Sequence, residues 1–104
     1  MKLFIMAALL MAQASFSLAQ TTSQQMACNN LRLSTKATLE CYESNAPTSQ
    51  IMACGALRYI KDISEVDIVD CTFSHAETSQ VMTCTSLQYR GKSAKEIMSC
   101  ILSF

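Results

Sequence analysis

The 104-residue sequence has only two glycines and one histidine, and each shortage excludes a class of function. Gly55 and Gly91 are too few to form a glycine-rich loop that cradles phosphate groups. His75 is the only imidazole that could act as a base for a serine or cysteine nucleophile. The sequence also has no hydrolase or metalloprotease motif. We therefore predict a protein that is not an enzyme and holds no cofactor.

Closely spaced cysteines are also absent. Structural zinc sites usually hold ligands about two to four residues apart, and thiol-exchange proteins usually carry Cys-x-x-Cys. The nearest cysteines here have twelve residues between them. His75 lies in a linker, and the corresponding position in the preceding unit is Asn45. We expect no metal site and an exposed linker histidine, with a thiol-redox or metal-handling role as the weaker alternative.

Long apolar runs are missing except at the N-terminus, where residues 3–12 are all apolar. These ten residues fall short of the roughly twenty needed to span a bilayer. Lys2 precedes the run, and Ser17-Leu18-Ala19 places small residues around a cleavage site. A second possible site lies at residues 12–14. We predict a secretory signal peptide over residues 1–19 and an exported protein, secreted or periplasmic, with no membrane span in its mature chain.

Excess charge is lacking as well. Without Lys2, the expected mature chain carries seven basic and eight acidic residues. Such a balance does not attract phosphate backbones or anionic lipid, so we expect no nucleic-acid partner. The mature chain, residues 20–104, has 85 residues and is large enough for one small domain.

Cysteine, in contrast, is abundant for so short a chain. An even number of cysteines in a small exported chain is typical of a disulfide framework, because an oxidising compartment preserves the bonds and a small core needs them. We predict that all six are bonded. They are Cys28, Cys41, Cys54, Cys71, Cys84 and Cys100.

The chain repeats itself. Thr-Ser-Gln occurs at residues 22–24, 48–50 and 78–80, followed each time by Met two residues later and Cys four residues later. A second cysteine lies near the end of each unit. Repeats of this size indicate supersecondary units that stack on one another. The single domain is therefore predicted to consist of units 21–46, 47–76 and 77–104.

The first part of each unit is predicted to be a helix. In residues 51–60 apolar side chains recur at spacings of one, three and four, and Thr48-Ser49 offers an N-cap oxygen. Only Met and Leu are apolar at matching positions in all three units, so we expect them in the core. They are Met26, Met52 and Met82, with Leu31, Leu57 and Leu87.

The second part of each unit also predicts a helix. Ser64 and Ser93 are each followed three residues later by an acid, which is the pattern of a capping box. Ser34 offers a cap without such an acid. The β-branched residues of 60–69 leave a strand as the weaker alternative. The predicted fold is all-α, with three disulfide-stapled helical hairpins, or six short helices, in a small solenoid or a compact bundle.

Two disulfide schemes fit this arrangement. In the first, each bond joins the two helices of one unit across its predicted turn: Cys28 to Cys41, Cys54 to Cys71 and Cys84 to Cys100. The rival scheme joins Cys41 to Cys54 and Cys71 to Cys84, and leaves Cys28 with Cys100 across the whole domain. We favour the first scheme, because residues equidistant from a turn come level in an antiparallel hairpin.

The chain predicts a binding or structural role rather than a specific partner. Tyr59 and Tyr89 recur near the ends of first helices, where packing between hairpins is favoured over contact with a partner. Unit two is acidic and unit three is basic, which could guide a protein, a surface or a second copy of the chain. A secreted toxin or effector is the alternative. The candidate partner residues are Tyr59, Asp62, Glu65, Asp67, Asp70, Tyr89, Arg90, Lys92 and Lys95.

Overall fold

Three helical hairpins make up the part of the protein described by the computed structural model, residues 21–104. The predicted signal peptide, residues 1–19, lies outside the described residues. Within them the secondary structure is entirely helical, which confirms the all-α fold and excludes the strand considered for residues 60–69. The α-helices are α2 (Thr22–Asn30), α3 (Thr35–Ser44), α4 (Thr48–Gly55), α5 (Glu65–Phe73), α6 (Thr78–Thr85) and α7 (Ala94–Leu102), and short 3-10 segments follow α4 (η1, Ala56–Tyr59) and α6 (η2, Ser86–Arg90).

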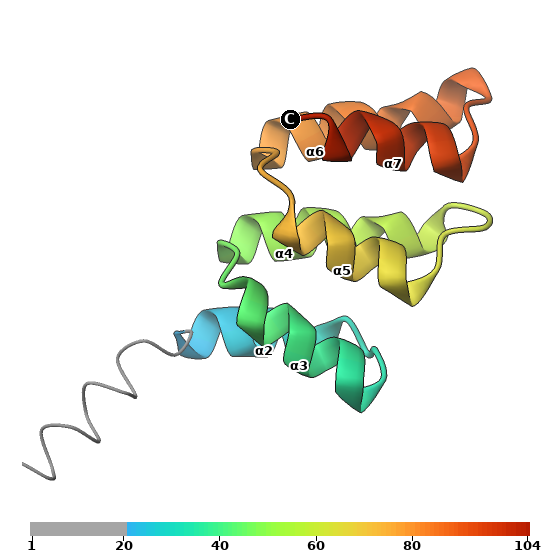
Figure 1. Ribbon diagram of the computed structural model, residues 1–104. Helices are drawn as coiled ribbons and strands as arrows, with labels where there is room; N and C mark the ends of the chain where they lie inside the picture. The colour runs from blue at the N-terminus through green and yellow to red at the C-terminus, as the bar shows by residue number, and fades with distance from the viewer. Residues whose placement is uncertain (1–20) are drawn as a thin grey trace, which may run out of the picture.

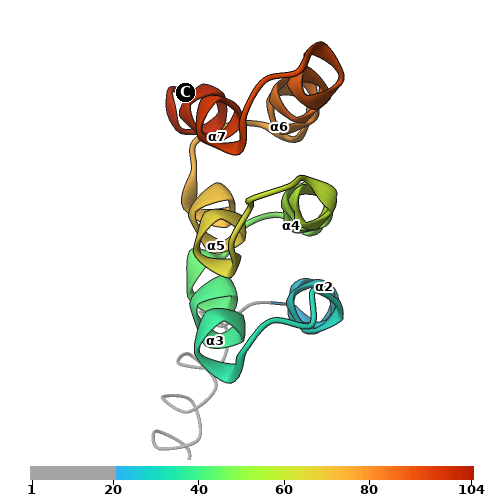
Figure 2. The same cartoon turned by 90° about the vertical axis from the view of Figure 1, so that its right-hand side faces the viewer.

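The hairpins stack side by side in two layers (Figures 1 and 2). Helix α4 packs between α2 and α6, and α5 packs between α3 and α7. We call α2, α4 with η1, and α6 with η2 the first-helix row, and α3, α5 and α7 the second-helix row. Because each hairpin packs chiefly on its neighbours, the arrangement is an open solenoid-like stack rather than a closed bundle. No helix within residues 21–104 is long and apolar enough to cross a membrane.

The turns between paired helices lie where the sequence predicts them. Each contains a residue with positive φ: Arg32 at 55°, Asp62 at 69° and Gly91 at 75°. Gly91 ends η2 in the left-handed conformation that glycine adopts without strain, as its position in the sequence predicts. The turn then leads directly into the cap of the second helix.

Three disulfides close the hairpins, and they follow the within-hairpin scheme. Cys28 bonds Cys41, Cys54 bonds Cys71 and Cys84 bonds Cys100, with Cα–Cα distances of 5.7 to 5.8 Å. The rival scheme is therefore wrong. All six cysteines are paired, so neither a thiolate ligand nor a free thiol is present in the oxidised chain.

The second helices begin at the predicted serines, and one cap is shared between hairpins. Ser64 and Asp67 form a capping box, as do Ser93 and Glu96. Ser34 accepts from the Ala37 amide but lacks an acid of its own. Glu65 of the next hairpin supplies it, accepting hydrogen bonds from both the backbone N–H and the hydroxyl of Ser34. One carboxylate therefore both caps α3 and ties the first hairpin to the second.

The Thr-Ser-Gln motif works differently from the prediction that Thr and Ser cap the first helices. The N-caps are one residue earlier, at Thr21, Pro47 and Glu77, so each motif occupies the first helical turn. In two cases the glutamine is the third residue of the helix and bonds back to the N-cap, because the Gln24 side chain accepts from the Thr21 amide and the Gln80 side chain from the Glu77 amide. Pro47 has no N–H to donate, and the N-cap bond is absent there.

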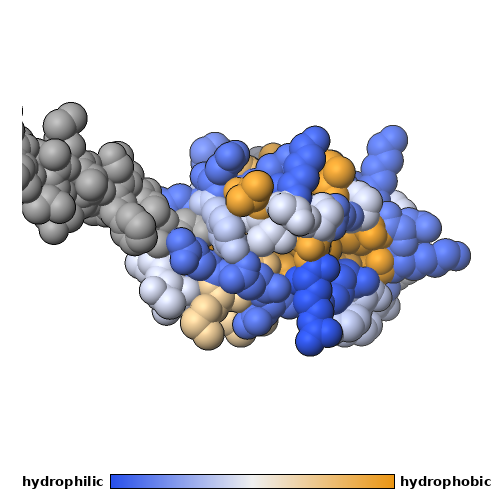
Figure 3. Space-filling model, turned by 90° about the horizontal axis from the view of Figure 1, so that it is seen from below, coloured by the Kyte–Doolittle hydropathy of each residue, from blue (hydrophilic) through white to orange (hydrophobic). Residues whose placement is uncertain are grey.

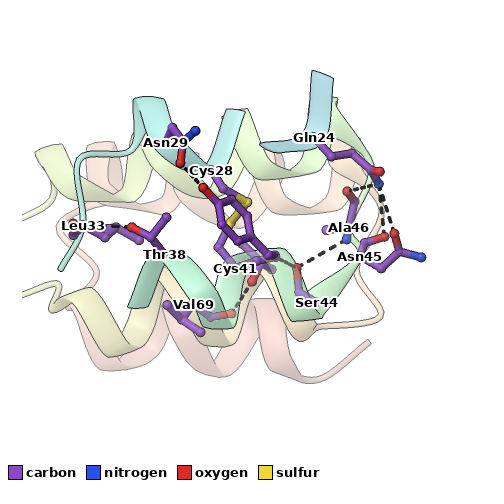
Figure 4. Close-up of a disulfide and its surroundings, with 12 residues drawn as sticks. Gln24, Cys28, Asn29, Leu33, Thr38, Cys41, Ser44, Asn45, Ala46 and Val69 are labelled. Atoms are coloured by element: carbon purple, nitrogen blue, oxygen red, sulfur yellow. Dashed lines mark hydrogen bonds between the residues drawn. A yellow bond between two sulfur atoms is a disulfide. The ribbon is translucent and has the colours of Figure 1, made fainter. Parts of the chain in front are cut away.

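Two of the three glutamines, Gln24 and Gln50, fasten the open ends of their hairpins. The Gln24 side chain donates to the carbonyl of Ala46 at 2.8 Å, and Figure 4 shows it pointing at the end of α3. Gln50 donates to the carbonyls of Cys71 and Ser74 at the end of α5. Glutamine therefore has a structural role in each unit, but not the same one: Gln24 caps its helix and fastens the hairpin, Gln50 fastens the hairpin, and Gln80 caps its helix.

The core lies between the two rows and includes the disulfides. Leu31 and Leu57 are buried as predicted, and Leu87 is half-buried in the last hairpin. The prediction of core methionines is wrong, because Met26, Met52 and Met82 are 58 to 65% exposed. Each Met precedes a disulfide-bonded Cys by two residues, or about 200° around a helix. Since the cysteine must face the second helix, the methionine faces away.

The hairpins pack closely along the stack, and the ends of the stack are more polar than its interior. A Cβ added at Gly55 would lie 2.4 Å from Leu31 Cδ2, so any side chain at this position would force the buried Leu31 to shift. Buried Ile60 is replaced by exposed Arg90 in the last hairpin. The first-hairpin end is mostly hydrophilic with separate hydrophobic patches (Figure 3). Polar ends limit further stacking.

Candidate binding surface

The exposed side of the first-helix row carries five large apolar side chains, which include the two most exposed ones in the part of the chain that the structure describes. Tyr59 and Tyr89 are 81 and 84% exposed, more than the three methionines of the same row. Exposed apolar residues that recur on neighbouring helices make a continuous surface rather than scattered contacts with water. We call this surface, formed by Met26, Met52, Tyr59, Met82 and Tyr89, the Met-Tyr surface.

Two hollows divide the Met-Tyr surface along the grooves between helices. One, of about 550 Å³, lies between α2 and α4 and is lined by Met26, Met52 and Tyr59. The other, of about 620 Å³, lies between α4 and α6, where Met82 and Tyr89 join Met52 and Tyr59. Because Met52 and Tyr59 line both hollows, α4 is the shared wall. The two hollows therefore adjoin each other on either side of α4.

The favoured prediction that the tyrosines pack between hairpins is wrong. Tyr59 and Tyr89 follow Leu57 and Leu87 by two residues, within segments where the α-helix has tightened to a 3-10 helix. At three residues per turn, two residues correspond to about 240°, so a tyrosine cannot share the inward direction of its leucine. The rings stand on the exposed side, beside the hollows.

Charge is segregated between the two helix rows. The first-helix row contains no acidic residue, and its charged side chains are Arg58 and Arg90. Six of the eight acids lie on the second-helix row: Glu40, Glu43, Glu65, Asp67, Asp70 and Glu96. The turns beside the first-helix row add Arg32, Lys61 and Lys92, together with Asp62. The apolar side of the stack is therefore bordered mainly by cations at its turn end.

The acidic candidates of the second hairpin are not assembled into a single free patch. Glu65 binds Ser34, and Asp67 accepts from the Ser64 amide at 3.0 Å. The hydrogen bond from the Ser34 backbone N–H lowers the pKa of Glu65 below its ordinary value of 4.5, and the hydrogen bond from the Ser34 hydroxyl lowers it further by a smaller amount. Asp70 is exposed on α5, away from the Met-Tyr surface, and Asp62 lies in the turn. Glu65 and Asp67 therefore stabilise helix starts, and the four acids do not form one binding site.

The basic candidates of the third hairpin adjoin the acids of the second. Lys95 shares a hollow with Asp62 and Asp67, which places opposite charges side by side. Lys92 pairs with Glu96 at 3.7 Å, and Glu96 has its pKa lowered chiefly by the hydrogen bond from the Ser93 backbone. Arg90 instead belongs to the first-helix row. The predicted contrast between hairpins is therefore weaker than the contrast between rows.

The sequence interpretation missed the three methionines and Arg58 as surface candidates. The spacing between Met and Cys contains the necessary signal, because residues two apart on a helix point to nearly opposite sides. Arg58 corresponds to Arg32 in the first unit but to Gln88 in the third, so the repeat does not keep a charge at this position in all three units. Its Nε donates to the Gly55 carbonyl at 3.1 Å, which holds the side chain beside the first hollow.

His75 occupies the linker between α5 and α6 and is exposed, as expected. Comparison with protein-family models, curated proteins and solved structures finds no match to this chain.

Proposed function

We propose that this is an exported, non-enzymatic binding module that holds a protein partner on its Met-Tyr surface. The observation that carries the proposal is the alignment of exposed Met and Tyr side chains on three neighbouring helices, around two hollows. Tyrosine and methionine are enriched at protein interfaces, where large flexible or amphipathic side chains adapt to a partner.

Export is supported by the disulfides and by the N-terminal sequence. Three disulfides in so small a chain are typical of proteins that fold outside a reducing compartment. Residues 1–19 have the charge, apolar run and small residues of a signal peptide. Both features indicate delivery to a periplasm or to the extracellular medium.

The non-enzymatic role is supported by how the polar side chains are used. Asp67, Glu96 and Glu65 cap helices, and Gln24 and Gln50 close hairpins. Their hydrogen-bonding capacity serves helix ends rather than a reacting group. The two hollows on the Met-Tyr surface are lined by hydroxyl, apolar and amide groups with Arg58, and contain no carboxylate or imidazole to transfer protons.

Export is tested on the chain recovered from a cell that secretes it. We expect an N-terminus at Gln20, and an intact mass six hydrogens below that of the same chain after reduction. Edman degradation and mass spectrometry before and after reduction give both values. A chain that retains residues 1–19, or one recovered with free thiols, would contradict the proposal of an exported disulfide protein.

Use of the Met-Tyr surface is tested by site-specific photo-crosslinking in the producing cell. Benzoylphenylalanine replaces Tyr59 or Tyr89, and as a matched control it replaces Phe73, an aromatic residue that is 50% exposed on the second-helix row. We expect the tyrosine positions, and not Phe73, to give one discrete crosslinked protein. Equal crosslinking from Phe73, or none from either tyrosine, would overturn the proposed function.

A further inference from the structure

We propose that the ligand of the Met-Tyr surface is an extended acidic peptide segment with two apolar side chains three residues apart. The proposal rests on the proposed function and specifies its ligand. It is derived from the charges around the surface and from the separation of the two hollows.

Charge complementarity identifies the acidic character of the peptide. Arg58 is exposed in η1 and lines the first hollow, and Arg90 is exposed at the end of η2. Arg32, Lys61 and Lys92 lie in the adjoining turns. The helical segments of this row contain no acid, and Glu77 stands at the opposite end of α6 from Arg90. Asp62 is the one acid in these turns, where it lies near Lys61 and Lys92, and Lys92 also pairs with Glu96. The positive charge left for carboxylates of a ligand at the turn end is therefore mainly that of Arg32, Arg58 and Arg90. Arg also binds carboxylates through paired hydrogen bonds.

The apolar spacing follows from helix packing. Packed helices lie about 8–10 Å apart, and the two hollows occupy successive grooves on either side of α4. An extended chain advances about 3.3 Å per residue and a polyproline II chain about 3.1 Å. Three residues therefore span about one helix-to-helix step. A polyproline II chain has three residues per turn, so its residues i and i+3 point to the same side, and a peptide in this conformation lying across the helices places both in the two hollows.

The groups that line the hollows suit a peptide backbone. Ser49 and Thr78 meet at 3.1 Å across the groove between α4 and α6, and Ser86 and Gln88 line its other end. Hydroxyl and amide groups can donate to carbonyls and accept from N–H groups of an extended chain, whose backbone is not paired internally. Exposed tyrosines beside such a groove match the aromatic surfaces that receive polyproline II segments.

Two other occupants share part of this chemistry. An anionic membrane would also attract arginine and lysine, but a flat lipid surface does not use a pair of hollows. A second copy of the chain could bring its acidic second-helix row against the first-helix row, which would produce head-to-tail association. Both occupants are outcomes of the test.

The test uses the oxidised full chain and the fluorescein-labelled peptide Glu-Leu-Pro-Glu-Leu-Pro-Glu, with fluorescence anisotropy at low salt. We expect saturable binding, weakened at least tenfold when the peptide glutamates become lysines and at least tenfold when its leucines become serines. Charge reversal in the protein, Arg58→Glu with Arg90→Glu, should also weaken binding at least tenfold. The matched control Lys36→Glu, on α3, should leave it unchanged.

Neutral variants keep the test informative if charge reversal disturbs folding. Arg58→Gln with Arg90→Gln should weaken binding by an intermediate factor with an unaltered circular dichroism spectrum. Equal affinity for acidic and basic peptides would overturn the acidic ligand. So would binding to phosphatidylglycerol vesicles but not to the peptide, or a dimer at the assay concentration whose formation depends on Arg58. If peptide binding fails while Tyr59 and Tyr89 still crosslink a protein, only this inference fails and the proposed function stands.

Discussion

Replacing Cys54 and Cys71 together with alanine is expected to lower the free energy of unfolding by more than the roughly 3 kcal/mol that closing such a loop contributes. The bond spans 17 residues in the middle hairpin and limits the unfolded chain. A domain of this size has only about 5–15 kcal/mol of stability, so the melting temperature should fall by about 12 °C or more. Thermal and urea unfolding followed by circular dichroism, under oxidising conditions, measures the change.

The matched control removes the bond of the last hairpin, Cys84→Ala with Cys100→Ala. Its loop spans 16 residues, so the entropic contribution is nearly identical. The middle hairpin differs because α4 and α5 each pack against a neighbour on both sides, whereas α6 and α7 pack on one side only. In a stack whose stability comes from neighbouring contacts, loosening the middle unit weakens two interfaces. Equal losses from the two variants would contradict this account of the fold.

The features predicted correctly from the sequence are those set by local chemistry. Ser64 and Ser93 predict their helix starts because a capping serine and an acid three residues later satisfy each other within one turn. Gly91 predicts its helix end because glycine adopts positive φ without strain. The disulfide pairing followed from these turns, since cysteines equidistant from a turn come level once the hairpin forms.

The features that local chemistry did not reveal depend on neighbouring hairpins. Ser34 lacks a nearby acid, and only stacking brings Glu65, 31 positions along the chain, to complete its cap. The close fit of Gly55 against Leu31 is likewise a contact between hairpins. A solenoid and a bundle share every local signal, so the helix patterns could not decide between them.

The candidate surface was only partly predictable, because the direction of each first helix was assigned from hydrophobicity alone. Met is as apolar as Leu, and the buried arc was placed to include both. The disulfide contains the better information, since a bonded cysteine fixes which side of its helix faces the partner helix. With Cys54 inward, Met52 must point outward. The same spacing applies to Tyr59, because two residues separate it from buried Leu57 and correspond to about 200° in an α-helix or 240° in a 3-10 helix.

The two-row architecture also changes how charge bears on binding. A chain with nearly equal numbers of acids and bases offers little net charge to a charged ligand when it is considered as a whole. Folding places most acids on the second-helix row and leaves Arg58 beside the first hollow and Arg90 at the end of η2. The local field at the Met-Tyr surface is therefore positive although the mature chain is not. Net charge alone does not exclude an acidic ligand.

Leu57→Ala is expected to lower the free energy of unfolding by about 2–5 kcal/mol, the range for emptying a fully buried leucine site. Leu57 is completely buried. It corresponds in the repeat to Leu31 of the first hairpin, whose side chain lies against Gly55 of the second hairpin. The residue of the third hairpin that corresponds to Gly55 is Thr85, on α6. Chemical denaturation of the oxidised variant, with the disulfides checked by mass, measures the loss.

Leu87→Ala provides the matched control, because it makes the same change at the same position of the last hairpin. Leu87 is only half-buried, since within residues 21–104 no further helix packs on this side of α6. Its removal should therefore cost only about 1 kcal/mol. The difference between the two variants measures the interface between the second and third hairpins rather than the leucine itself. Similar losses would mean that each hairpin is stabilised mainly by its own disulfide and core, and that the first-helix row lacks the rigidity needed to hold two hollows in register.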